Sequence, residues 1–247
     1  MDYIDYFDSE SKRILYNGIV IYVISLFIFW NLTEILYRCC KLNFQTIYCF
    51  LHFITNFVIV LISIPYASTL IYDPLGLDSS YDEYRYIHNT YAILNALHLI
   101  HILCLYRKLY FNDFLHHLLT LIFWLQGVYL KHPIYSVLLI NNSGIPGGLT
   151  YLMLFLSKIN KFSGFSEKYY SMLLNVYIRC PLSIIFSTIL YCRMVSYETE
   201  LSNKLCIMFI IFFTMMNGIY YMTTIVESYY RVYYKNYYVQ INKQKQE

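Results

Sequence analysis

The sequence predicts an all-α membrane protein, a polytopic bundle of about seven transmembrane helices. Of its 247 residues, 58% are hydrophobic and only 13% are charged. The apolar residues come in long blocks, and a helix needs about 20 mostly apolar residues to cross a bilayer. Because backbone in lipid must satisfy its own hydrogen bonds, these blocks are expected to be helices and not strands.

Seven blocks have or approach the length of a membrane span. They cover roughly residues 14–36, 47–71, 88–106, 114–130, 134–156, 171–192 and 205–227. The third and fourth blocks are the weakest, because histidines and asparagine dilute the third and the fourth is short. The tail after about residue 230 is polar and is expected to fray. No linker rich in proline, glycine or serine divides the chain, which predicts one membrane domain.

The positions of lysine and arginine predict the orientation. With seven spans, six of these residues fall on the amino-terminal side and eleven on the opposite side, while Arg179 lies inside a span. The positive-inside rule then places the carboxyl terminus in the cytosol. The first dozen residues are acidic and lack the basic start of a cleavable signal, so the first helix is expected to stay as a signal anchor.

Two adjacent histidines, His116 and His117, begin the fourth block, with Asp113 one helical turn before them. Ionisable side chains at the edge of hydrocarbon are costly and often functional, and histidine transfers protons near neutral pH. Asp113 can reach one imidazole on a helix. Two interpretations remain open: a carboxylate that orients a general base, or an interfacial pair that anchors the helix end.

Two further histidines, His98 and His101, share one face of the third block. A short connection should make the third and fourth helices antiparallel neighbours, so that four histidines could approach one another. We do not predict a metal site, because His98 and His101 lie well inside their helix whereas His116 and His117 begin the next. The seven cysteines contain no Cys-x-x-Cys pair either. A polar contact between helices is expected instead.

Three other blocks carry polar groups at membrane depth. His52 has Asn56 one turn later and is expected to form an interhelical hydrogen bond. Arg179 needs a partner or a water-filled cavity, and it either holds an anionic head group or snorkels to the surface. The run Asn141-Asn142-Ser143-Gly144-Ile145-Pro146-Gly147-Gly148 should break or bend the fifth helix. Such a break lines a binding site in many transporters. Alternatively, it is a kink that allows close packing between helices.

Taken in order, these residues resemble the TLC domain, the membrane module shared by ceramide synthases, translocation-associated membrane proteins and lipid-homeostasis proteins. The resemblance covers about residues 40–235. It divides the chain into an amino-terminal segment with the first helix (1–40), a TLC-like domain (41–235) and a polar tail (236–247). The matching segments are Cys49-Phe50-Leu51-His52, Asp113-Phe114-Leu115-His116-His117-Leu118-Leu119-Thr120, Ser143 with Pro146, Arg179-Cys180-Pro181, and Met216-Asn217-Gly218-Ile219-Tyr220.

The resemblance implies a protein of the endoplasmic reticulum, or a related membrane, that binds, senses or regulates membrane lipids. Its cavity would lie among the helices, floored by the paired histidines and the bent fifth helix. The residues expected to contact lipid are Arg179, Asn141, Asn142, His52, His98 and His101.

An acyl-CoA-dependent N-acyltransferase of the ceramide-synthase type is the alternative. In it, His116 or His117, assisted by Asp113, would deprotonate a sphingoid amine for attack on an acyl thioester. Ceramide synthases carry acidic residues on the next helix, where this chain has Asn141-Asn142-Ser143-Gly144. That difference favours the noncatalytic interpretation. No cofactor is expected, apart from acyl-CoA as a substrate of the alternative.

Two further classes, a transporter and a translocation accessory protein, stay open, although no inverted repeat relates the two halves. The net charge of +3, without a basic cluster, gives no indication of nucleic-acid binding. Membrane lipids are the partners that the resemblance implies. The sequence does not specify which lipid is bound or how many chains assemble.

Overall fold

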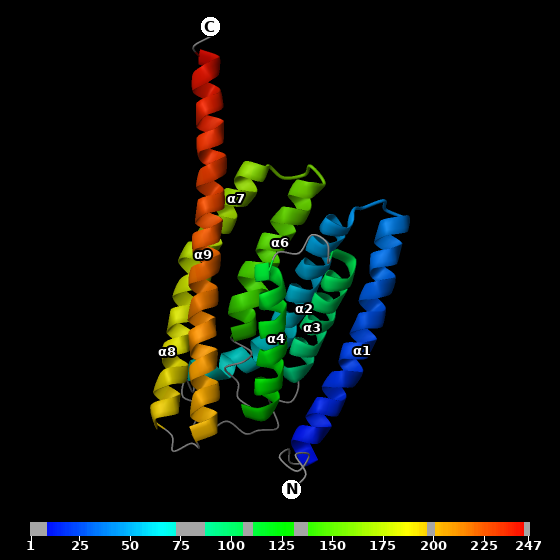
Figure 1. Cartoon of the computed structure of the whole chain (residues 1–247), viewed down its shortest axis with the longest axis vertical. Coiled ribbons are helices and arrows are strands. Elements are labelled where there is room, and N and C mark those ends of the chain that lie inside the picture. The colour runs from blue at the N-terminus through cyan, green and yellow to red at the C-terminus, as the bar shows by residue number, and fades with distance from the viewer. Residues whose placement is uncertain (1–8, 73–86, 106–110, 131–137, 197–200, 245–247) are drawn as a thin grey trace.

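The computed structural model describes residues 9–72, 87–105, 111–130, 138–196 and 201–244, and every regular element in these ranges is a helix. The all-α prediction is confirmed for this part of the chain. The helices lie side by side along one long axis (Figure 1). They are α1 (Ser9–Arg38), α2 (Phe44–Tyr72), α3 (Ile87–Leu105), α4 (Phe111–Leu130), the π-helix η4 (Ile140–Gly144), α6 (Ile145–Lys158), α7 (Gly164–Leu174), the π-helix η5 (Asn175–Arg179), α8 (Cys180–Ser196) and α9 (Leu201–Gln244).

Four stretches of the described chain are long and apolar enough to cross a membrane. They are Lys12–Arg38, Phe44–Pro65, Gly164–Ser196 and Leu201–Tyr237. They coincide with the first, second, sixth and seventh predicted blocks, and they fit an integral membrane protein. Helices also form at the other three blocks, but their described residues do not meet the same criterion. Histidines and asparagines lower the hydropathy of these three helices.

The polar character of α3 has a structural reason, because this helix is surrounded by others. Its side chains pack against both α1 and α2. Ala96 and Leu97 are fully buried, and they pack with Phe29 of α1 and Leu51 of α2. Small residues such as alanine let membrane helices approach closely. The polar residues of α3 therefore face protein instead of lipid.

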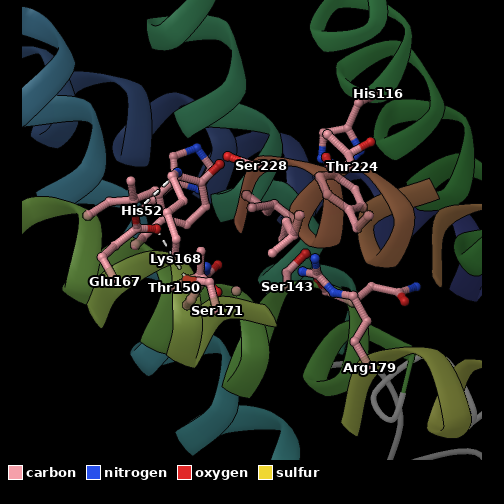
Figure 2. A pocket seen from close by; sticks show the side chains of 18 of the residues that line it. His52, His116, Ser143, Thr150, Glu167, Lys168, Ser171, Arg179, Thr224 and Ser228 are labelled. Atoms are coloured by element: carbon pink, nitrogen blue, oxygen red, sulfur yellow. Dashed lines mark hydrogen bonds and ion pairs between the residues drawn. The ribbon is translucent and has the colours of Figure 1, made fainter. Parts of the chain in front are cut away.

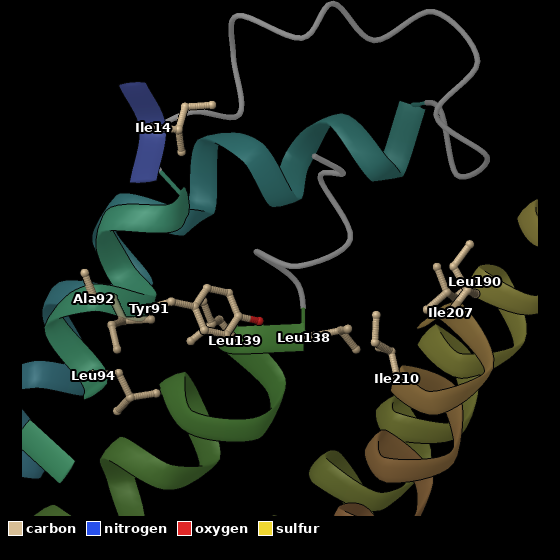
Figure 3. Close-up of a cluster of buried hydrophobic side chains, with 10 residues drawn as sticks. Ile14, Tyr91, Ala92, Leu94, Leu138, Leu139, Leu190, Ile207 and Ile210 are labelled. Atoms are coloured by element: carbon tan, nitrogen blue, oxygen red, sulfur yellow. The ribbon is translucent and has the colours of Figure 1, made fainter. Parts of the chain in front are cut away.

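A second apolar cluster brings together residues from both halves of the chain. Tyr91 and Leu94 of α3 meet Leu138, Leu139 and residues of the last two helices (Figure 3). The cluster is completed by Ile14, Ile59, Ala92, Leu190, Ile207 and Ile210. Leu138 and Leu139 lie between α3 and the last two helices, so the cluster connects the carboxyl-terminal helices to α3 through these two residues.

The outer surface is apolar, as expected for a chain in lipid. Large side chains such as Phe27 of α1 (71% exposed), Ile185 of α8 and Phe212 of α9 point away from the bundle. Buried positions, in contrast, include many polar side chains, among them His52 and Asn56. This distribution is inverted relative to a protein whose surface meets water.

The last helix is longer than the sequence predicts. Helix α9 continues to Gln244, so the expectation that the chain frays after about residue 230 is wrong for the backbone up to that residue. Tyrosines spaced four apart contact each other along it, with ring centroids 6.0 Å apart for Tyr229–Tyr233 and 6.1 Å for Tyr230–Tyr234. Such pairs stabilise a helix by a few tenths of a kcal/mol each.

Two π-helical segments interrupt the helices in the carboxyl-terminal half of the chain. The break predicted in Asn141–Gly148 is confirmed as η4, and Pro146 follows it in the first turn of α6. Segment η5 ends at Arg179, two residues before Pro181. Proline cannot donate a helical hydrogen bond, and π-segments of this kind are frequent at functional sites.

Candidate functional site

A cavity of about 270 Å³ lies between the central and carboxyl-terminal helices. Its wall draws side chains from α2, α3, α4, α6, α7 and α9 and from both π-segments. Figure 2 shows Glu167, Lys168 and Ser171 of α7 grouped near Thr150, with Arg179 on another part of the wall. The polar lining residues are His52, Asn56, His98, His116, Asn142, Ser143, Thr150, Tyr151, Glu167, Lys168, Ser171, Arg179, Tyr221, Thr224 and Ser228.

The guanidinium of Arg179 is the cation that η5 presents to this cavity. The residue is 7% exposed, so the snorkelling alternative is wrong. Its Nη1 donates to Asn175 Oδ1 at 3.1 Å, and its Nη2 donates to the carbonyl of Asn142. The guanidinium carbon lies 4.7 Å from the ring centroid of Tyr221. Among the described residues, no carboxylate pairs with Arg179 and its Nε has no partner. Its positive charge is therefore incompletely compensated.

The side chain of Asn141 lies behind the cavity wall and connects the two π-segments. Its Nδ2 donates to Ser183 Oγ at 2.9 Å and contacts the Arg179 carbonyl at 3.4 Å. Ser183 Oγ in turn donates to the same carbonyl at 2.8 Å. Asn141 is 2% exposed and does not line the cavity, whereas Asn142 does. The structure therefore gives Asn141 a positioning role and leaves Asn142 on the cavity wall.

Four histidines of α3 and α4 meet at one side of the cavity. His101 Nδ1 and His117 Nε2 are 2.9 Å apart, and the ring centroids of His98 and His117 are 4.3 Å apart. His116 lines the cavity, with its ring centroid 5.5 Å from that of His98. The predicted approach of these histidines is confirmed.

The difference in depth that argued against a metal site is absent from the structure. His101 stands four residues before the end of α3 at Leu105, and His116 stands five residues after the start of α4 at Phe111. At 1.5 Å per residue, His101 lies about 6 Å from the end of α3 and His116 about 8 Å from the start of α4. Antiparallel neighbours therefore bring them to one level.

His52 belongs to an adjoining aromatic group, and to the residues that the structure describes it makes no interhelical hydrogen bond of the kind expected. Its ring stacks on Tyr151 with centroids 4.3 Å apart, and it lies 5.7 Å from His98. Tyr48 stacks on His101 at 3.6 Å, and its hydroxyl is 3.3 Å from that of Tyr151. The His52 Nε2 has no partner among the described residues. This group extends the polar lining onto α2 and α6.

The proposed pairing of Asp113 with a histidine is not addressed by the structure. Asp113 lies within α4, but its side chain is outside the residues whose side chains the structure describes. Among the described residues, His117 contacts His101 and His98, and His116 contacts His98 and the ring of Tyr221, which lies at 5.9 Å.

A carboxylate on the cavity wall, Glu167, was missed by the sequence analysis. The residue is 3% exposed, its Oε2 lies 3.1 Å from Lys168 Nζ, and its Oε1 accepts a hydrogen bond from Ser171. In the sequence, Glu167 falls between the fifth and sixth predicted blocks. A signal was available, because Ser163 caps α7 by accepting from the Ser166 amide, which puts Glu167 in the first helical turn.

No protein-family model, curated protein or solved structure matches this chain. The functional argument therefore depends on the chemistry of the cavity. That cavity offers the buried Arg179 cation, the Glu167–Lys168 ion pair, neutral amides, hydroxyls and imidazoles within a bundle whose outside is apolar. This combination suits a ligand with a polar end and an apolar end.

Proposed function

We propose that this chain is a multi-pass membrane protein of the TLC type that binds a membrane lipid and thereby senses or regulates lipid composition. The observation that carries the proposal is Arg179, a buried cation on the wall of a polar cavity with no acidic partner among the described residues. Arginine at membrane depth requires a partner or water. An anionic head group in the cavity supplies the missing charge.

The direction of the terminal helices supports seven crossings. Helices α1 and α9 run the same way along the long axis (Figure 1). Two terminal spans that run in the same direction require an odd number of crossings, and four is even. Adding α3, α4 and the combined η4–α6 helix to the four apolar spans gives seven. The lysine and arginine positions then favour a cytosolic carboxyl terminus.

The positions of the TLC-like motifs support that assignment too. His52, His116, Ser143 and Arg179 come from four segments far apart in the sequence, and all four line the same cavity. Asn217, from the fifth motif, lines an adjoining smaller cavity that also includes His116 and Ser143. The motifs of the resemblance thus line two adjoining cavities that share His116 and Ser143, which fits a lipid site between the helices. Location in the endoplasmic reticulum belongs to the same proposal.

The size of the cavity suits a head group better than a whole lipid. A volume of 270 Å³ is near the lower end of the range of about 300–1,000 Å³ for small-molecule pockets. The acyl chains would therefore lie along the apolar surfaces of the helices. Arg179 and the adjacent Asn142 would select for a phosphate or carboxylate in the head group.

The test identifies lipids that co-purify with the full-length chain in mild detergent by mass spectrometry. Anionic lipid should be enriched in the wild type and should fall about ten-fold in Arg179→Gln, since a lost charged hydrogen bond costs about 1.5–3 kcal/mol. Arg179→Lys should retain part of the anionic lipid. Arg231→Gln is the matched control, because its side chain is exposed on α9. Equal lipid content in Arg179→Gln and wild type would refute the proposal.

A ceramide-synthase-like acyltransferase is the second candidate, and the position of His116 favours it. This imidazole lines the cavity next to the hydrogen-bonded His117 and His101, so a base and a proton-accepting chain adjoin the space that a substrate would occupy. Purified protein incubated with a long-chain base and acyl-CoA should then form amide. The product should disappear in the His116→Ala/His117→Ala double variant, and amide formation that survives it would exclude these histidines as the base.

A further inference from the structure

The histidines at the edge of the cavity have a geometry that neither the lipid-binding proposal nor the acyltransferase alternative requires. One ring nitrogen from each of His98, His116 and His117 lies within 4.8 Å of the other two. The ligands of a tetrahedral zinc ion, at 2.0–2.1 Å from the metal, are about 3.3 Å apart. Each pair therefore has to approach by about 1.5 Å at most, which small rotations of the side chains provide.

The hydrogen bond from His101 prepares this arrangement. A neutral imidazole has one N–H and one lone pair, and the contact made by one nitrogen sets the role of the other. When His117 Nε2 donates to His101 Nδ1, the His117 lone pair lies on Nδ1. An outer histidine that fixes the tautomer of a ligand in this way is a regular feature of metal sites.

Two of the ring nitrogens are buried without compensation. His98 Nδ1 and His117 Nδ1 have no hydrogen-bond partner among the described residues, and their side chains are 3% and 5% exposed. A buried polar atom without a partner costs about 1–3 kcal/mol. A single cation between the rings would bind both nitrogen atoms.

We infer that His98, His116 and His117 bind one divalent transition-metal ion, with zinc as the expected occupant and His101 as the positioning residue. Imidazole suits zinc and its neighbours, whereas magnesium and calcium require oxygen ligands. Three histidines leave a fourth position open, and that position faces the cavity because His116 lines it. Neutral ligands leave the charge of the ion in place, so its remaining ligand is water or an anion from the cavity.

The test measures metal in the full-length protein, purified in detergent through a tag without histidines. After incubation with Zn²⁺ and gel filtration, the wild type should retain about one ion per chain. Retention should fall about ten-fold or more in His98→Asn and in His117→Asn. Cobalt added in place of zinc should give the absorption of a tetrahedral ion in the wild type but not in His98→Asn or His117→Asn. A wild type that retains no zinc and gives no cobalt spectrum would overturn the inference.

Control variants separate loss of the site from loss of the fold. His88→Asn removes another buried histidine of α3, ten residues before His98 and outside the cluster, and it should retain zinc. Added zinc should raise the melting temperature of the wild type and of His88→Asn but not that of His98→Asn. His101→Asn keeps an acceptor for the His117 N–H, so it should weaken zinc binding less than His101→Leu does. Equal zinc retention in His98→Asn, His117→Asn and wild type would also overturn the inference.

Discussion

Single side chains at the two π-segments determine what the cavity presents. The side-chain amide of Asn141 in η4 donates to Ser183 and contacts the Arg179 carbonyl. The Arg179 guanidinium in turn donates to the Asn142 carbonyl. Each contact connects groups 37 to 42 residues apart in the chain. Polar contacts between membrane helices average about 0.6 kcal/mol each, so their main effect here is to fix the direction of the guanidinium.

The first prediction concerns Gly218, where α9 crosses α8. A Cβ at this position would lie 2.8 Å from both Cβ and Oγ of Ser183. Gly218→Ala should therefore lower the free energy of unfolding by about 1–2 kcal/mol, because overpacking outweighs the gain in helix propensity. Unfolding in detergent, followed by circular dichroism, measures the change.

The matched control for this prediction is Gly164→Ala. A Cβ there would be 3.7 Å from Ser157 Oγ, an ordinary van der Waals contact. This variant should be as stable as the wild type or slightly more stable. If Gly218→Ala proved equally stable, the close approach of α8 and α9 described here would be incorrect.

At the scale of elements, the central position of α3 organises the molecule. Its buried apolar residues pack on α1 and α2, and its histidines turn toward α4 and the cavity. A helix with these polar groups would be a poor span if it faced lipid, because unsatisfied polar groups are costly in hydrocarbon. The surrounding helices therefore supply the contacts that these polar groups would lack in lipid.

The second prediction compares two phenylalanines of α1. Phe29 is 8% exposed and packs against α2 and α3, whereas Phe27 is 71% exposed. Phe29→Ala should lower the free energy of unfolding by about 1–3 kcal/mol. This is less than the 3–5 kcal/mol typical of water-soluble cores, because the lipid that replaces protein contacts is itself apolar.

Phe27→Ala is the control, and it should change stability by less than about 0.5 kcal/mol. Unfolding in mixed micelles measures both variants. A larger effect at Phe27 than at Phe29 would mean that α1 presents the opposite face to the bundle.

At the scale of the whole molecule, the apolar exterior and the polar interior together define a protein that meets lipid outside and encloses a hydrophilic space. Exposed side chains such as Phe27, Ile185 and Phe212 cover the outside. The cavity gathers residues from six α-helices and both π-segments, so no single helix or pair of helices contains the site. Lipid binding and metal binding would accordingly both depend on the assembled bundle.

The third prediction concerns the membrane topology. The proposed seven crossings put the two termini on opposite sides, and the lysine and arginine positions predict a cytosolic carboxyl terminus. Glycosylation-acceptor tags fused to either end should therefore be modified at the amino terminus alone. Modification at both ends or at neither would indicate an even number of crossings, as with the four apolar spans by themselves.

The candidate site could be predicted only in part from the sequence. The approach of His98 and His101 to the paired histidines follows from helix periodicity and a short connection, and the structure confirms it. The similar depth of His101 and His116 was not foreseen, because it depends on where α3 ends and α4 begins. Glu167 was missed for the same reason, since helix boundaries are set by capping contacts such as that of Ser163.

The sequence by itself determined the helical class, the apolar segments and the bend at Asn141–Gly148, because hydropathy and proline or glycine content act locally along the chain. Only the tertiary structure decided that Arg179 is buried, that Asn142 lines the cavity while Asn141 supports it, and that three histidines converge. These properties depend on how neighbouring helices rotate and cross, and that is set by side-chain packing between segments far apart in sequence.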